Sequence, residues 1–239
     1  MRGILNSEWI KFYSSPLCVI GSIGTVLIAP VILLIMGANK VDISDVFTQS
    51  IRAFACSQAG IAVVAAGFFG QEYEQSCLRT TFLSTPSRIK VIAAKAIVLI
   101  GITVLASIVS GLLCVAVGAI QHDSTLTFRL VSEFMIRIAI ATISWIQIAL
   151  ISAGLAMITK TQVTPIAVIV PLVLGLSQLL FMVSKLARFL PDLATMNLFL
   201  SSNSSAFLDT LSGVFVQFTW VLLFGVPAIW LTLHRDIYS

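Results

Sequence analysis

The sequence is poor in charge. Only 10% of its 239 residues are Asp, Glu, Lys or Arg, whereas 58% are hydrophobic and the mean hydropathy is +1.05. A soluble domain is closer to half apolar and about a quarter charged. The composition therefore excludes an ordinary soluble protein and predicts a chain that lies in lipid.

Residue types that serve catalysis and metal binding are also scarce. The two histidines, His122 and His234, lie in a loop and near the C-terminus, and the apolar runs contain no Asp or Glu. These absences argue against a membrane protease or metallohydrolase and against proton coupling through carboxylates in the spans. The four cysteines show no paired spacing that would indicate disulfides or zinc: Cys18, Cys56, Cys77 and Cys114.

Long charge-free runs are what the chain has instead. Each is long enough for the roughly 20 residues that a helix needs to cross about 30 Å of hydrocarbon. Barrel strands would show alternating segments of about 10 residues, which are not seen. We predict an all-α membrane protein with one transmembrane domain over residues 1–239. Its six spans are expected at about 17–37, 51–70, 91–120, 135–158, 164–184 and 212–233.

The basic residues predict that both termini are cytoplasmic. With the N-terminus inside, eight Lys or Arg residues fall on the cytoplasmic side and six on the outer side. The eight are Arg2, Lys11, Arg79, Arg88, Lys90, Lys95, Lys160 and Arg235, and the six are Lys40, Arg52, Arg129, Arg137, Lys185 and Arg188. Distributed over loops in this way, the net charge of +4 indicates no nucleic-acid partner.

Residues 1–16 precede the first span and predict a short helix on the cytoplasmic membrane surface, with a disordered tail as the alternative. Leu5, Trp9 and Phe12 recur at helical spacing and form an apolar stripe. Glu8 and Lys11 lie off that stripe.

Two features are expected in the C-terminal half. Pro171, followed by Gly175, predicts a bend in the fifth span. The segment 186–209 is half apolar but too interrupted by polar residues to span, and we expect it to form short re-entrant helices packed on protein at the outer face.

The few charges gather between the second and third spans, in the stretch GQEYEQSCLRTTFLSTPSRIKVIAAK at residues 70–95. Its apolar residues recur at the helical period and predict an amphipathic helix from about Glu72 to Leu83, which Pro86 terminates. Lys90 and Lys95 can extend from the start of the third span to the interface. A plain loop needs only about 2–8 residues, so segment 71–88 predicts either a surface helix or a helix that docks a cytoplasmic partner.

This stretch resembles the segment of ABC-2 type exporter permeases that reads G-x-E-x, several residues, L-R-x-x-L-x-x-x-P-x-R and then a lysine. The matching residues are Gly70, Glu72, Leu78, Arg79, Leu83, Pro86, Arg88 and Lys95. The chain departs from the family at Ser76-Cys77, where Gly-Thr is common. The surface helix, the six spans and the broken outer segment also fit the family.

The resemblance implies a half-transporter in a bacterial plasma membrane. It would pair with a second permease, the same or related, and dock two cytoplasmic ABC ATPase subunits, which bind ATP and magnesium. This chain would hold no cofactor, and it has no G-x-x-x-x-G-K-[ST] loop. The cargo would be amphipathic, such as an antimicrobial peptide or drug. The docking residues would be Glu72, Tyr73, Glu74, Leu78, Arg79, Phe82, Leu83, Pro86 and Arg88, beside the surface helix with Leu5, Glu8, Trp9, Lys11 and Phe12.

Mild polar residues remain inside the spans, and we expect them to form helix–helix hydrogen bonds. They are Gln58, Ser144, Gln147, Ser152, Gln178 and Gln217. The alternative is a substrate path, for which Gln58 and Gln178 are the candidates.

Three other functions are possible for a chain of this kind: a six-helix substrate-capture subunit, a membrane enzyme and a channel. A channel would need a charged ring or filter repeat, which the sequence does not show.

Overall fold

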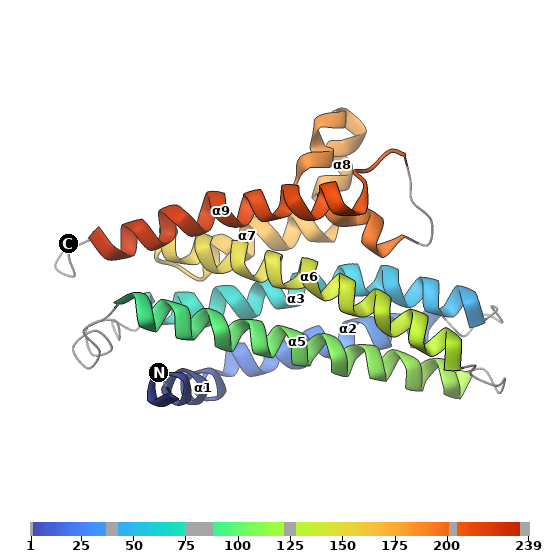
Figure 1. The fold of residues 1–239 in the computed structure, drawn as a ribbon, viewed down its shortest axis with the longest axis horizontal. Coiled ribbons are helices and arrows are strands. Elements are labelled where there is room, and N and C mark those ends of the chain that lie inside the picture. Colours follow the sequence, from blue (N-terminus) through green and yellow to red (C-terminus); the bar gives the residue numbers. More distant parts are fainter. Residues whose placement is uncertain (1, 37–42, 75–87, 122–127, 201–204, 235–239) are drawn as a thin grey trace.

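The computed structural model describes residues 2–36, 43–74, 88–121, 128–200 and 205–234, and every regular element in these ranges is a helix (Figure 1). The elements are α1 (Arg2–Ser14), α2 (Pro16–Met36), α3 (Ile43–Glu74), α5 (Arg88–Gln121), α6 (Phe128–Thr159), α7 (Val163–Pro171), η1 (Leu172–Leu176), α8 (Ser177–Val183), η2 (Lys185–Phe189), η3 (Leu193–Phe199) and α9 (Thr210–His234).

Six helical stretches are long and apolar enough to cross a membrane, which confirms the predicted fold class. They are Pro16–Ile35, Gln49–Gln71, Ile89–Ile120, Val131–Thr159, Val163–Val183 and Thr210–His234. Several helices extend past the charge-free runs, because α3 already begins at Ile43 and α6 at Phe128.

The second span is the centre of the bundle. In its most apolar window 78% of the residues are buried, against 11% in the last span. Small residues allow this close packing, since helices in lipid associate through tight van der Waals contact. At Gly60, for example, a Cβ atom would overlap the Thr25 hydroxyl of α2.

Hydrogen bonds fasten α3 to α6. Trp145 stacks on Phe54 with 4.3 Å between ring centroids and donates through Nε1 to the Phe54 carbonyl. Ser152 donates to the Ala62 carbonyl at 2.7 Å, and Gln58 Nε2 donates to Ser144 Oγ at 2.8 Å. The predicted helix–helix hydrogen bonding is therefore confirmed for Gln58, Ser144 and Ser152.

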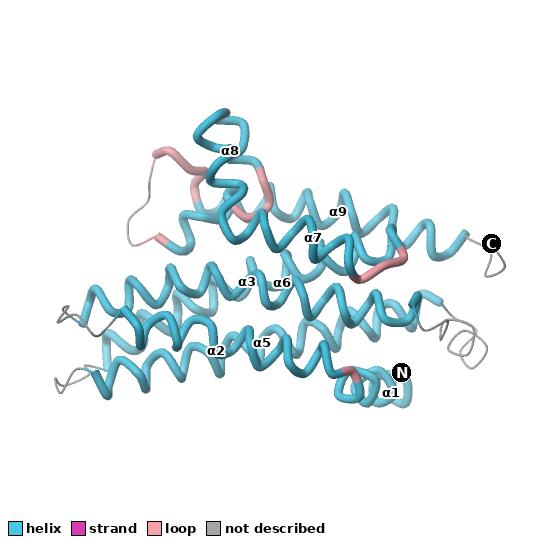
Figure 2. The backbone as a smooth tube through the Cα atoms, turned by 180° about the vertical axis from the view of Figure 1, so that it is seen from behind, coloured by secondary structure: helices cyan, strands magenta, loops and turns pink. Residues whose placement is uncertain are grey.

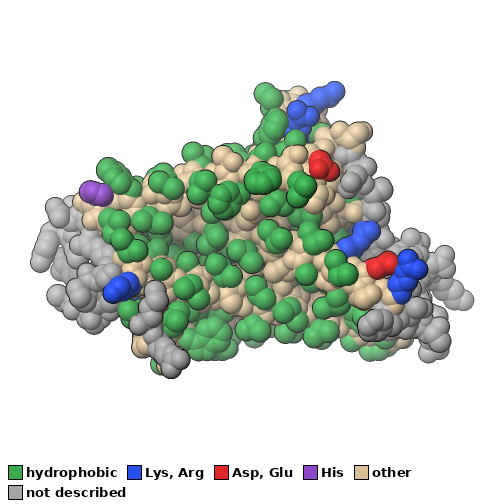
Figure 3. Space-filling view, viewed as in Figure 1, with side chains coloured by type: hydrophobic (Ala, Val, Ile, Leu, Met, Phe, Trp, Pro, Cys, Tyr) green, Lys and Arg blue, Asp and Glu red, His purple; other side chains and the backbone are tan. Residues whose placement is uncertain are grey.

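The two ends of the bundle differ. Helix α1 and the C-terminal end of α9 lie at one end, and η2 lies toward the other (Figures 1 and 2). On the face drawn in Figure 3, hydrophobic side chains cover the flank, while the coloured charged side chains gather toward the ends. This distribution is that of a protein whose flank faces hydrocarbon and whose ends face water.

The fifth span bends where the sequence predicts. Helix α7 ends at Pro171, a π-helical turn follows, and Gly175 has a φ of +142° before α8 begins. Glycine adopts this left-handed conformation at no steric cost. Beyond the bend the chain forms η2 and η3, and most of η3 is buried.

Candidate coupling site

Helix α1 crosses the end of the bundle and packs on α5 and α2. Phe12 is buried and meets Phe68 of α3 edge-on, with 5.3 Å between ring centroids. Leu5 also packs on the core, whereas Trp9 is 36% exposed. One side of α1 therefore anchors it to the spans, and its outer flank carries the aromatic side chain that favours a membrane interface.

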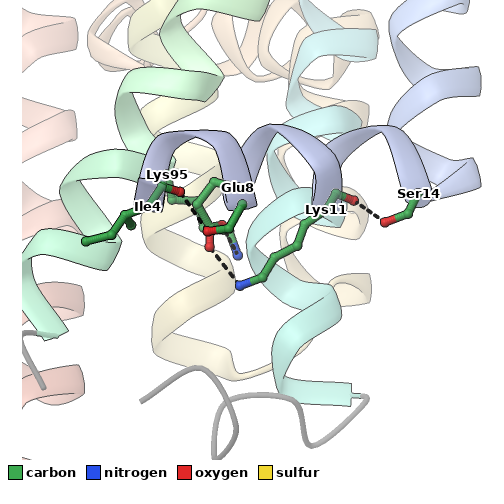
Figure 4. Close-up of polar contacts among 6 residues, drawn as sticks. Ile4, Glu8, Lys11, Ser14 and Lys95 are labelled. Atoms are coloured by element: carbon green, nitrogen blue, oxygen red, sulfur yellow. Dashed lines mark hydrogen bonds and ion pairs between the residues drawn. The ribbon is translucent and has the colours of Figure 1, made fainter. Parts of the chain in front are cut away.

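Glu8 points from α1 into the bundle (Figure 4). Its side chain is 1% exposed, and the carboxylate lies 2.7 Å from Lys11 Nζ and 3.6 Å from Lys95 Nζ of α5. Glu8 is thus buried although it lies off the apolar stripe of its helix. A carboxylate can be buried here because two ammonium groups compensate its charge, which apolar surroundings alone would not allow.

Lys95 is buried as well, with 3% of its side chain exposed. The expectation that it extends to the interface is therefore wrong, whereas Lys90, one helical turn earlier, is exposed. Lys95 Nζ lies 4.8 Å from the Phe68 ring centroid and 5.5 Å from that of Phe69. Aromatic faces attract a cation at such distances, so Lys95 joins α1, α3 and α5 at one point.

The predicted docking segment lies between two described helix ends. Its residues Leu78, Arg79, Phe82, Leu83 and Pro86 lie outside the described part of the chain. Glu72, Tyr73 and Glu74 form the last turn of α3, not the first turn of a separate helix as expected, and Arg88 begins α5. Tyr73 is half-buried and packs on the core. The second span thus runs directly into the segment, so both flanks of the segment are anchored in spans.

Gly70, the first residue of the family-like motif, has a structural role that the sequence did not reveal. A Cβ atom on it would lie 2.7 Å from the Gln162 Cα atom. The turn between α6 and α7 can therefore press against the end of α3 only because residue 70 is glycine. The turn between α6 and α7 thus meets the end of α3 at Gly70.

The two candidates for a substrate path are not brought together. Gln58 is 2% exposed and bonded to Ser144, whereas Gln178 is exposed on α8. Of the other polar residues, Gln147 donates to the Val214 carbonyl at 3.3 Å, and the buried amide of Gln217 has no hydrogen-bond partner among the described residues. Gln58 therefore serves helix packing in this conformation.

The sequence contains one indication of the Glu8–Lys95 pair. Lys95 lies past the start of a long apolar run, where an ammonium group needs a partner, and Glu8 is the acidic residue of the preceding surface helix. In the part of the chain that the structure describes, no three His, Cys, Asp or Glu residues are grouped so as to hold a metal ion.

Comparison with known protein families gives a match over most of the chain. A family model described as ABC-2 family transporter protein matches residues 4–178, which is well over half of the chain and runs from α1 to the start of α8. No curated protein matches the sequence.

Proposed function

The chain belongs to the ABC-2 family of transporter proteins and is a membrane subunit of an ABC transporter, and from this premise we propose that it works as the permease half of an ATP-driven exporter. It pairs with a second permease, identical or related, and docks two cytoplasmic ATPase subunits through segment 71–88. The exported cargo is amphipathic, such as an antimicrobial peptide or drug.

The observation that carries the proposal is the anchoring of the docking segment. The segment continues α3 on one side and leads into α5 on the other. Seven residues after α5 begins, Lys95 is fixed to Glu8 of α1 and stands over Phe68 of α3. Movement of an ATPase bound to the segment would therefore pull on α1, α3 and α5 together, because packed elements shift between discrete arrangements and do not deform continuously.

Charge supports a protein partner for the segment. It combines acidic Glu72 and Glu74 with basic Arg79 and Arg88, whereas a helix that only covers lipid has a mainly basic polar face. ATP binding belongs to the partner subunits under this proposal, and magnesium enters with that nucleotide.

Recruitment of the ATPase tests the proposal. A tagged chain, gently extracted from its own host's membranes, is expected to co-purify with soluble subunits that contain phosphate-binding loops. Glu72→Lys and Arg79→Glu should reduce that recovery about ten-fold or more, because rim charges repelled by the partner weaken association by a few kcal/mol.

The matched controls carry the same charge changes at exposed residues far from the segment. They are Asp209→Lys and Lys185→Glu, which should recruit the ATPase as the parent does. A chain that repeatedly purifies without ATPase, or variants that recruit equally with parent and controls, would contradict the docking role.

A further inference from the structure

A second buried polar region lies between the bent fifth span and the segment that follows it. Residues 185–199, which comprise η2, the connection and η3, are called the clasp segment here. Leu193, Ala194 and Thr195 of this segment are fully buried. Thr195 Oγ1 lies 2.9 Å from Ser144 Oγ, at the middle of α6. The clasp segment thus returns deep into the bundle.

A directional chain of hydrogen bonds runs through this region. Gln58 Nε2 donates to Ser144 Oγ, Ser144 and Thr195 share a hydrogen bond, and Thr195 Oγ1 donates to the Asp192 carbonyl at 3.4 Å. The chain links α3, α6 and the clasp segment, and it ends at Asp192. Buried polar groups normally occur in such satisfied series.

The side chain of Asp192 departs from this rule. The residue is only 9% exposed, its Oδ2 atom contacts the Ser177 hydroxyl, and its Oδ1 atom is buried without a hydrogen-bond partner. Ser177 directly follows the π-helical turn that contains Gly175. Asp192 therefore connects the clasp segment to the bend of the fifth span.

The hydrogen of the Ser177 hydroxyl indicates which protonation state of Asp192 fits this geometry. Ser177 Oγ also lies 2.9 Å from the Leu172 carbonyl oxygen, which can only accept. A hydroxyl has one hydrogen to donate. Ser177 cannot give its one hydrogen fully to both oxygens. An ionised Asp192 must share this hydrogen with the Leu172 carbonyl, whereas with a protonated Asp192 that donates to Ser177, the Ser177 hydroxyl is free to donate to Leu172 alone. Protonation also removes the negative charge from a buried carboxylate whose Oδ1 atom makes no hydrogen bond of normal geometry.

No charged side chain among the described residues offsets the carboxylate. The charged residues nearest along the chain, Lys185 and Arg188 of η2 and Asp209 before α9, are all exposed. Burial raises the pKa of Asp192 to about 6, and contacts with Ser177 and the backbone of Asp192 and Leu193 oppose this rise. Among the described residues, no cation lies where it would favour the ionised form of Asp192.

We propose that Asp192 is a proton-binding site whose protonated carboxyl holds the clasp segment against the bend of the fifth span. Loss of the proton leaves a charge in a buried site and makes the two Ser177 contacts share one hydrogen, so the clasp segment releases. The ligand is the proton itself, and the bistable element is the contact between η3 and the bend after Pro171. The proposal does not depend on ATPase docking.

The linkage between proton binding and opening of the clasp segment gives the sign and size of the pH dependence. The clasped state binds the proton more tightly than the released state, in which the carboxyl returns to its ordinary pKa of 3.8. The opening constant therefore rises with pH between about 4 and 6 and is level above that range. From pH 5 to pH 8 the rise is about ten-fold.

Hydrogen–deuterium exchange of the purified full chain measures this opening directly. After correction for the intrinsic pH dependence of amide exchange, peptides covering residues 186–199 should exchange about ten-fold faster at pH 8 than at pH 5. Peptides from α6 should not change. Asp192→Asn, which keeps a neutral donor at this site, should abolish the rise, while the exposed control Asp209→Asn should retain it.

Two results would overturn the proposal. One is a parent profile without the rise between pH 4 and 6, and this readout needs no variant. The other is an Asp192→Asn protein whose clasp segment responds to pH as the parent does, which would assign the response to another group such as a histidine.

Discussion

Glu8 shows how one carboxylate can organise a membrane protein. It joins a surface helix to the third span because Lys11 and Lys95 both approach it, at 2.7 Å and 3.6 Å. Breaking a buried ion pair by removing one partner costs about 3–5 kcal/mol, because the remaining charge stays in a place of low dielectric. The pair is thus weak evidence for stability but strong evidence for a fixed geometry.

Glu8→Gln should lower the melting temperature of the detergent-extracted protein, since it leaves the Lys95 charge without its carboxylate. Adding Lys95→Met should restore much of the loss, because the second charge is then removed as well. The measurement is a thermal unfolding curve for each single variant and the double variant.

The control is Glu133→Gln, which breaks the exposed pair with Arg129 at 3.0 Å. Exposed pairs contribute only about 0–1 kcal/mol, so its melting temperature should match that of the parent. Equal melting of Glu8→Gln and Glu133→Gln would show that the buried pair has no special role.

Some contacts between elements depend on glycine, whose role at a given position the sequence does not reveal. Gly213 of α9 lies against η3, where a Cβ atom would overlap the Ala194 carbonyl oxygen. The last span can therefore hold the clasp segment only if this position lacks a side chain. Gly225 lies about three turns further along the same helix, and a Cβ atom added there would meet open space.

Gly213→Ala should loosen the contact between α9 and the clasp segment, with a fall in melting temperature and faster amide exchange in residues 193–199. Gly225→Ala adds the same methyl group to the same helix and should be neutral or slightly stabilising, because alanine is the better helix former. If both variants behave alike, the close approach at Gly213 does not hold the segment.

The described part of the chain has six candidate spans, and α1 and the end of α9 lie at the same end of the bundle (Figure 1). Hydrophobic side chains cover the flank on the face drawn in Figure 3, and the last two candidate spans are the least buried of the six. These spans have the surface that a second permease or lipid would cover. The basic residues of the sequence predict that both termini are cytoplasmic, and labelling can check this orientation.

Cysteines at exposed residues on opposite ends should report that orientation. In a Cys77→Ser background, Ser205→Cys should react with a membrane-impermeant maleimide in intact cells, and Lys90→Cys only after permeabilisation. Cys18 and Cys114 are buried and should contribute little background. The reverse pattern would mean that the termini are outside.

The sequence by itself determined the fold class, the six spans and the bend after Pro171. Hydrophobic length is a local property, and lipid allows a chain of this composition few solutions besides helices. The motif at residues 70–95 likewise indicated the family, because a motif is a pattern of residue types along the chain and does not depend on the tertiary structure.

Only the tertiary structure decided which polar groups meet. Glu8 was placed off the apolar stripe of its own helix, and Lys95 was expected to reach the interface, because neither prediction included the partner helix. Nothing in the sequence indicated that Asp192 is buried, because the apolar residues around it are interrupted by polar ones. Gln58 and Gln178 both lie in spans, but Gln58 is buried and Gln178 is exposed. Burial of a charge or an amide depends on partners distant in sequence, and the packing of α1, the clasp segment and the spans supplies those partners.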